Sequence, residues 1–310
     1  MKIVSIGEVL WDVIEGQEYL GGAPFNFAAH MGRLGHTVFF VSGVGRDQRG
    51  ERVLQKMAEL GLSTQYVCRV EEAATGWVEV TLEAGGQPHF IIHRPAAYDF
   101  VRLSEPELQR LASERPDWIY FGTLMQMSPQ AKSLTMALLA SNKSVRRFYD
   151  VNLRPECYEA ALVRELMSQA TVVKLNEDEA AEIAQMFGRP QHASLEEFCR
   201  SYSRELGWEA VCVTRGARGC ALLIGDEYIS KPMVTRWRWR IRWARATPLP
   251  RHFFMGWAAD GRRHELPISL TAWAPWSQAA EARFLHGAWK KQWRLRKAVS
   301  SQHSALSIQP

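Results

Sequence analysis

The alternation of strand-like and helix-like segments between Trp118 and Ile224 restricts the possible folds more than any other feature of this sequence. Short apolar runs rich in β-branched and aromatic residues are followed by longer segments with apolar residues at helical spacing. Neighbouring parallel strands need a long crossover, usually a helix, and this alternation supplies one. The sequence therefore predicts an α/β fold with a parallel-sheet core and helices on both faces. The predicted strands and helices are 118–121 with 130–140, 147–151 with 160–168, 171–175 with 177–187, and further strands at 210–214 and 220–224.

The first hundred residues contain a second pattern beside the strand–helix alternation. Gly22 and Pro24 open a predicted helix, and Gly35 lies beyond its end. Alternating apolar and polar residues on both sides of Gly85 predict a β-hairpin. We therefore expect a small sheet standing off the core. The predicted elements are a strand at 1–7, a strand at 37–42, a helix at 47–60, and small-sheet strands near 13–20 and 76–94.

The charge of the chain is divided unevenly at Pro232. Residues 233–310 contain 14 Lys or Arg and 3 Asp or Glu, whereas residues 1–232 contain 24 and 30. Eight of the twelve tryptophans also follow Pro232. The net charge of +5 therefore belongs to the last segment and indicates no nucleic-acid or membrane partner for the rest. We predict a domain at 1–232 and an aberrant basic segment, rich in Trp and Arg, at 233–310.

Targeting signals are not recognised in the sequence. No run approaches about 18 consecutive apolar residues, so no membrane span is expected. The first residues lack the basic and apolar regions of a secretory signal. The five cysteines form no C-x-x-C pair, which is typical of reduced thiols in a cytoplasm. A cytoplasmic protein is the expectation.

Polar residues follow several of the predicted strands, at the edge where open parallel sheets bind ligands. Each cluster has a simpler explanation: an Asp after a strand often caps a turn, paired glycines often form one, and Asn176 can cap its helix. Several such clusters at one edge nevertheless predict a ligand site. The clusters are Asp12; Gly22 with Asn26; Asp150 with Asn152 and Arg154; Asn176 with Glu179; and Thr214 with Gly216 and Gly219.

The order and spacing of these segments resemble the PfkB (ribokinase-like) carbohydrate kinases, most of all the fructokinase branch. The resemblance runs from Met1 to about Pro232. It rests on the strings IGEVLWD (6–12), GGAPFNFAAHMGRLG (21–35), VSGVGRDQRGERVLQKMAELG (41–61), RPAAYD (94–99), YDVNLRP (149–155), KLNEDEA (174–180) and VTRGARGCAL (213–222).

The resemblance implies a ribokinase-like fold with a small β lid, ATP and Mg²⁺ as cofactors, and phosphorylation of a sugar hydroxyl. It also implies that a homodimer formed through the lid is one possible assembly. The implied sugar contacts are Asp12, Gly22, Asn26, Arg94 and Asn152. The implied phosphate or ATP contacts are Arg154, Lys174, Asn176, Thr214, Gly216 and Gly219, with Glu179 contacting Mg²⁺ through water.

The catalytic loop that the resemblance leads us to expect is missing. PfkB kinases carry a string of the form D-T-x-G-A-G-D, whose glycines expose backbone amides at a helix start and whose last Asp is the base. No such string occurs in this chain, and the stretch after Pro232 reads MVTRWRWRIRWARATPLP. We therefore assign no catalytic residue, and we expect the chain as it stands to be inactive.

A shift of reading frame offers an explanation for this loss. In one shifted frame, the codons for Arg240 to Thr247 can read D-T-V-G-A-G-D, and the junction of Trp243 and Ala244 must encode glycine. Residues 266–285 can read A-D-F-A-N-R-V-G-A-V-V-A-S-R-G-G-A-I-P, similar to the C-terminal segment of the family. We hypothesise a frameshift, by the insertion or deletion of one or two bases, near the codons for Pro232 and Met233.

Other interpretations remain open at this point. The chain could be a sugar-binding protein without catalysis, because Asp12, Gly22 and Asn26 are present. The alternating Arg and Trp of residues 236–245 could bind nucleic acid or an anionic membrane. Fructose is the preferred sugar, and ribose, 2-keto-3-deoxygluconate and a nucleoside are the alternatives.

Overall fold

The computed structural model describes residues 1–82, 88–141, 144–188, 194–231, 257–259 and 262–264. The chain divides into two compact units, Met1–Val234 and Thr235–Pro310. The second unit is described only where β14 (Trp257–Ala259) pairs antiparallel with β15 (Arg262–His264). The rest of the segment predicted to be aberrant, residues 233–310, lies outside the described residues.

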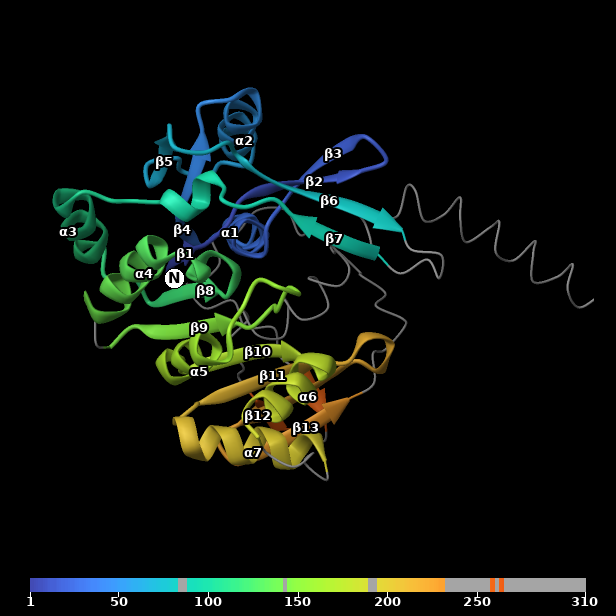
Figure 1. Ribbon diagram of the computed structural model, residues 1–310. Coiled ribbons are helices and arrows are strands. Elements are labelled where there is room, and N and C mark those ends of the chain that lie inside the picture. The colour runs from blue at the N-terminus through green and yellow to red at the C-terminus, as the bar shows by residue number, and fades with distance from the viewer. Residues whose placement is uncertain (83–87, 142–143, 189–193, 232–256, 260–261, 265–310) are drawn as a thin grey trace, which may run out of the picture. The chain divides into compact units, whose positions relative to one another are not determined.

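The first unit is built on a sheet of nine strands within its described part (Figure 1). The seven strands from β5 to β11 run parallel, as the strand–helix alternation predicts. β12 and β13 then pair antiparallel, since the links before them are too short for a crossover helix. Their spatial order is β13 (Glu227–Lys231), β12 (Cys220–Ile224), β11 (Ala210–Thr214), β10 (Val172–Asn176), β9 (Arg146–Asp150), β8 (Trp118–Gly122), β1 (Lys2–Ile6), β4 (Thr37–Gly45), β5 (Val67–Val70).

Alternate residues of the strands bury the two faces of this sheet against different helices. Val4 and Ile6 of β1 belong to the large core cluster that also includes buried residues of α3 to α7. Ser5 lies between them and donates a hydrogen bond to the carbonyl of Pro24 in α1 on the other face. Helices therefore cover both faces, as expected. They are α1 (Ala23–Arg33), α2 (Gln48–Glu59), α3 (Glu105–Ser113), α4 (Pro129–Ser141), α5 (Ala160–Gln169), α6 (Glu177–Met186) and α7 (Leu195–Leu206).

A second sheet of four strands stands off this core, as the alternating pattern predicts (Figure 1). Its central strands β2 and β6 run parallel, and each is paired antiparallel with an outer strand. We call this sheet the lid sheet. Residues 83–87, between β6 and β7, lie outside the described residues. The order is β3 (Gln17–Gly21), β2 (Leu10–Ile14), β6 (Gly76–Leu82) and β7 (Pro88–Ile92).

Two further expectations concern the chain's environment. All five cysteines are free thiols. None of the helices in the described part of the chain has the length and apolarity to cross a membrane.

Candidate functional site

The polar clusters meet at one edge of the large sheet because its parallel strands end there. Asp150 closes β9, Asn176 closes β10 and Thr214 closes β11. Glu8 follows β1 and Gly22 caps α1 at the same edge. The structure therefore brings together the clusters that the sequence placed after separate strands.

Asp12 is an exception to the predicted placement. It lies inside β2 of the lid sheet, paired with Tyr19 and Val78, and not in the loop after β1. A Cβ built on Gly21 would lie 2.5 Å from Asp12 Oδ2, so this carboxylate rests directly against the glycine backbone. The side chain therefore reaches the start of α1 from the lid sheet.

Gly22 provides the turn that brings this carboxylate to α1. Its φ of 104° lies in the region that favours glycine, and a Cβ there would meet the carbonyl oxygen of Glu8 at 2.5 Å. Its carbonyl accepts the hydrogen bond of the Asn26 amide at 2.9 Å, which forms the first turn of the helix. Asp12, Gly22 and Asn26, predicted as a sugar-binding set, are thus brought together.

Lys174 and Asp150 form a buried ion pair behind this edge. Lys174 Nζ lies 3.1 Å from Asp150 Oδ1, and the Tyr120 hydroxyl donates to Asp150 Oδ2 at 2.7 Å. Burial alone would lower the pKa of Lys174, but the charges of Asp150 and Glu179 outweigh it and raise the pKa. The ammonium group is therefore held by the protein itself, and its predicted contact with ATP stays a prediction.

Glu179 joins two loops of the site by accepting backbone hydrogen bonds with both oxygens. Oε2 accepts from the Asn176 amide at 2.7 Å and Oε1 accepts from the Leu153 amide at 3.0 Å. Asn176 Oδ1 in turn accepts from the Glu179 amide, which completes a capping box at the start of α6. Burial raises the pKa of Glu179 despite Lys174 nearby. Asn176 therefore does cap its helix, and Glu179 holds the loop after β9.

The predicted arginine contacts have different surroundings. Arg94 donates to the carboxylate of Asp99 and to the Leu124 carbonyl, and only 19% of its side chain is exposed. Its guanidinium is used within the base of the lid, so its contact with a sugar stays a prediction. The guanidinium carbon of Arg154 instead lies 5.5 Å from the ring centroid of Phe90 in β7. This contact links the loop after β9 to the lid sheet.

The loop between β11 and β12 is compact and tied to α6. Gly216 and Gly219 have positive φ values of 54° and 87°, and the Arg215 amide donates to the Gly219 carbonyl at 2.8 Å. Arg215 and Arg218 both pair with Glu177 at the start of α6. These contacts give the predicted nucleotide loop a defined backbone shape.

Asn152 also has a positive φ, 39°, in the loop after β9.

Glu8 also lies at this edge, although no role was predicted for it from the sequence. It is 3% exposed, and its Oε2 has no hydrogen-bond partner among the described residues. Burial raises its pKa from 4.5 to about 7, although backbone hydrogen bonds and the charge of Arg154 oppose this. Its position directly after a buried strand was the feature of the sequence that could have identified Glu8 as a candidate site residue.

The pH dependence of stability should report on Glu8. Since its pKa is higher in the folded chain, the protonated form stabilises the fold below pH 4.5, and this contribution is lost as the pH rises to about 7. A shift of this size corresponds to about 3 kcal/mol. Glu8→Gln, which mimics the protonated acid, should match the wild type at pH 4 and exceed its free energy of unfolding by about 3 kcal/mol at pH 8.

Urea unfolding across this pH range measures the difference. Glu15→Gln, at an exposed position in the turn between β2 and β3, serves as the control and should follow the wild type. A constant difference between Glu8→Gln and the wild type at every pH would contradict the prediction.

Comparison with known proteins identifies the family of this chain. A family model described as pfkB family carbohydrate kinase matches residues 2–234. Probable fructokinase-5 of Arabidopsis thaliana is 28% identical over 196 residues, covering 57% of this chain and 60% of that protein. The ATP-dependent 6-phosphofructokinase of Thermoanaerobacterium thermosaccharolyticum is 28% identical over 247 residues, covering 73% and 72%.

Solved structures agree on the fold. The crystal structure of fructokinase from Vibrio cholerae O395 in its fructose-, ADP- and calcium-bound form superposes with a TM-score of 0.60. It is 24% identical and covers 74% of this chain and 75% of that chain. The matched family segment ends at residue 234, close to Pro232, where the composition of the sequence changes. These findings confirm the resemblance drawn from the motifs: the chain belongs to the pfkB family of carbohydrate kinases.

Proposed function

We propose that this chain derives from an ATP-dependent kinase of fructose or a similar sugar, and that as it stands it binds the sugar without phosphorylating it. The observation that carries the proposal is the contact of the Asp12 carboxylate with the backbone of Gly21, beside the start of α1. The second part rests on the sequence, in which no D-T-x-G-A-G-D string occurs.

The proposed sugar subsite lies between the lid sheet and α1. The carboxylate of Asp12 can accept hydrogen bonds from two neighbouring hydroxyls, and charged acceptors form the stronger bonds. Gly22 lets a ligand approach the backbone closely, and Asn26 adds an amide in the first turn of α1. Arg94 and Asn152 complete the proposed set. Fructose is the first candidate, with ribose, 2-keto-3-deoxygluconate and a nucleoside as alternatives.

The proposed nucleotide subsite lies at the ends of β9, β10 and β11. Arg154 and Asn176 would contact phosphates together with Lys174, and Thr214, Gly216 and Gly219 would shape the loop beside the nucleotide. Mg²⁺ would be held mainly by phosphate and water, with Glu179 as its contact through water, because the described residues contain no cluster of three ligating side chains. Bound there, the ion would neutralise charge on the phosphates.

Phosphoryl transfer needs two elements that are not recognised in the present sequence. A base must accept the proton of the attacking hydroxyl, and oriented amides must stabilise the developing charge. The family places both in the missing loop. The division at Pro232, the cytoplasmic location and a homodimer through the lid sheet belong to the same proposal.

Calorimetry of the full chain with each of the four sugars tests the binding half. We expect fructose to bind, and we expect Gly21→Ala to weaken it about 10-fold or more, because the new Cβ would displace the Asp12 carboxylate. Gly35→Ala serves as the control, since nothing lies within 4 Å of a Cβ there. Its φ of 84° makes some loss of stability the expected effect, so this variant shows whether a loss of stability alone weakens sugar binding.

Three results would contradict the proposal. The first is an absence of binding by every sugar in a folded sample. The second is equal sugar affinity in Gly21→Ala and wild type. The third is robust ADP production from ATP and fructose by the present chain, which would disprove the predicted inactivity.

A further inference from the structure

Two tryptophans occupy the face of the lid sheet opposite to Asp12. Trp11 of β2 and Trp77 of β6 are register partners on adjacent parallel strands, so their side chains project from the same face. Trp11 is 6% exposed. The ring of His93 stacks on Trp77 with a centroid separation of 3.6 Å and an interplanar angle of 11°.

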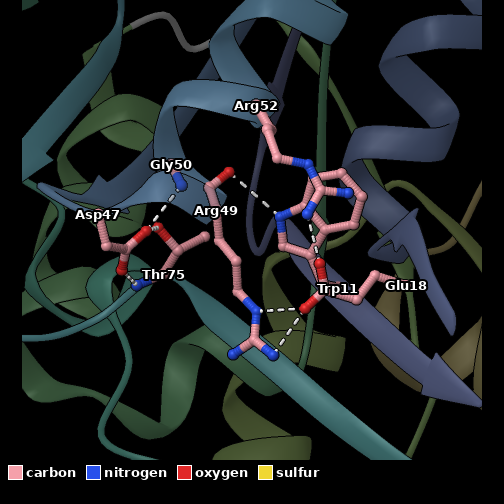
Figure 2. A network of polar contacts seen from close by, with 7 residues as sticks. All are labelled: Trp11, Glu18, Asp47, Arg49, Gly50, Arg52 and Thr75. Atoms are coloured by element: carbon pink, nitrogen blue, oxygen red, sulfur yellow. Dashed lines mark hydrogen bonds and ion pairs between the residues drawn. The ribbon is translucent and has the colours of Figure 1, made fainter. Parts of the chain in front are cut away.

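Helix α2 places one arginine over each tryptophan. The guanidinium carbon of Arg52 lies 4.1 Å from the ring centroid of Trp11, and that of Arg49 lies 4.9 Å from Trp77. Trp11 Nε1 also donates a hydrogen bond to the Arg49 carbonyl at 3.2 Å (Figure 2). The helix and the lid sheet are therefore joined by two cation–π contacts and a hydrogen bond.

Glu18 of the neighbouring strand β3 connects the two arginines. Its Oε1 accepts from Arg49 Nε and Nη2 at 2.8 Å each, and its Oε2 accepts from Arg52 Nη1 (Figure 2). The side chain of Glu18 is 24% exposed. Burial would raise its pKa, but the hydrogen bonds and charges of both arginines lower it overall, so the carboxylate stays charged at neutral pH. The three charged groups hold each other in one arrangement.

The start of α2 is fixed independently on the same side. Asp47 caps the helix by accepting from the Gly50 amide at 2.7 Å, and it accepts from the amide and hydroxyl of Thr75 at 2.7 Å each (Figure 2). Thr75 directly precedes β6. The helix is therefore tied both to the beginning of β6 and to the outer face of the lid sheet.

Asp12 follows Trp11 in β2 and projects from the opposite face, because successive strand residues alternate. Any shift of Trp11 relative to α2 would move Asp12 relative to Gly21 and the start of α1. We propose that Trp11, Glu18, Arg49 and Arg52 form a clamp that positions Asp12 for the sugar. They are positioning residues, and the inference rests on the proposed sugar-binding function.

The decisive variant is Glu18→Gln, with Glu51→Gln as the matched control. Glu51 is also a glutamate bonded to an arginine, but it ties α2 to Arg69 of β5 and not to the lid sheet. In the full-length chain we measure the fructose dissociation constant, amide hydrogen exchange and the urea midpoint. For Glu18→Gln we expect about 10-fold weaker fructose binding and faster exchange in β2 and β3, with unchanged exchange in β8 and β9. Glu51→Gln should leave the fructose affinity and the exchange of β2 unchanged.

Arg52→Lys gives a second readout of the same clamp. Lysine keeps the charge but loses the planar group that lies over Trp11, so we expect an intermediate loss of fructose affinity. If Glu18→Gln leaves β2 exchange and fructose affinity unchanged, the clamp proposal is overturned. It is also overturned if Glu51→Gln, at an equal urea midpoint, weakens fructose binding as much, since the effect would then be general loss of stability.

The exchange measurement separates this proposal from the proposed function. If the wild type binds no sugar, the sugar-binding function fails. Faster β2 exchange in Glu18→Gln alone would still support the clamp, and equal exchange in all variants would overturn it.

Discussion

A coding sequence with one base added near the codons for Pro232 and Met233 is expected to encode a kinase at least about 10⁴-fold more active towards fructose than the present chain. The base and the oriented amides each contribute factors of about 10²–10⁴ to reactions of this kind. The shifted frame can supply both in the string D-T-V-G-A-G-D. The measurement is ADP formation from ATP and fructose by the two purified proteins.

Two parts of the candidate site are already ordered in the first unit. Asp12 already rests against Gly21, and Glu179 already holds the loop after β9 through the Leu153 amide. A restored loop would therefore add its base and amides to the proposed sugar and nucleotide subsites.

A restored chain whose loop ends in asparagine in place of its last aspartate is the control. It should fold as the restored chain does and show little activity, because only the base is removed. An inactive restored chain that nevertheless folds would contradict the frame hypothesis. Equal activity in the restored and the present chain would contradict the assignment of the missing loop.

The second large effect is expected from Asp150→Asn, which should lower the free energy of unfolding by about 3–5 kcal/mol. This variant leaves the Lys174 ammonium group, whose side chain is 10% exposed, without its nearest countercharge. The amide oxygen of the introduced asparagine can still accept from the Tyr120 hydroxyl, so the loss comes mainly from the unpaired buried charge. The charge of Glu179 also raises the pKa of Lys174 but does not replace the direct contact at 3.1 Å.

Urea unfolding at pH 7 measures this loss, with two controls. The double variant Asp150→Asn with Lys174→Met should recover much of the stability, because neither charge then stays buried. Glu165→Gln breaks the exposed pair with Lys132, whose side chains are 43% and 34% exposed, and should cost less than about 1 kcal/mol. Equal costs for Asp150→Asn and Glu165→Gln would show that burial does not strengthen the pair.

Much of the candidate site was predictable because parallel strands place their carboxyl ends together. Asn176, Glu179 and Thr214 were assigned to one edge from strand–helix alternation alone, and the structure brings them there. Asp12 was predicted in the loop after the first strand, but it lies in a strand of the lid sheet. The pattern of residues 10–21 does not reveal that this strand places the Asp12 carboxylate beside Gly21, next to the start of α1. The helices α3 and α7 were also not predicted, although Ser104 and Ser194, which directly precede them, are typical N-cap residues.

The amino-acid sequence by itself determined the parallel core, the family and the absence of the catalytic loop. These follow from local periodicity and from strings of residues, which need no knowledge of distant contacts. Only the tertiary structure decided the antiparallel edge of the sheet, the partners of Arg94 and Lys174, and the burial of Glu8. Each of these depends on segments far apart in the chain, because desolvation and pairing are set by whatever surrounds a side chain in space.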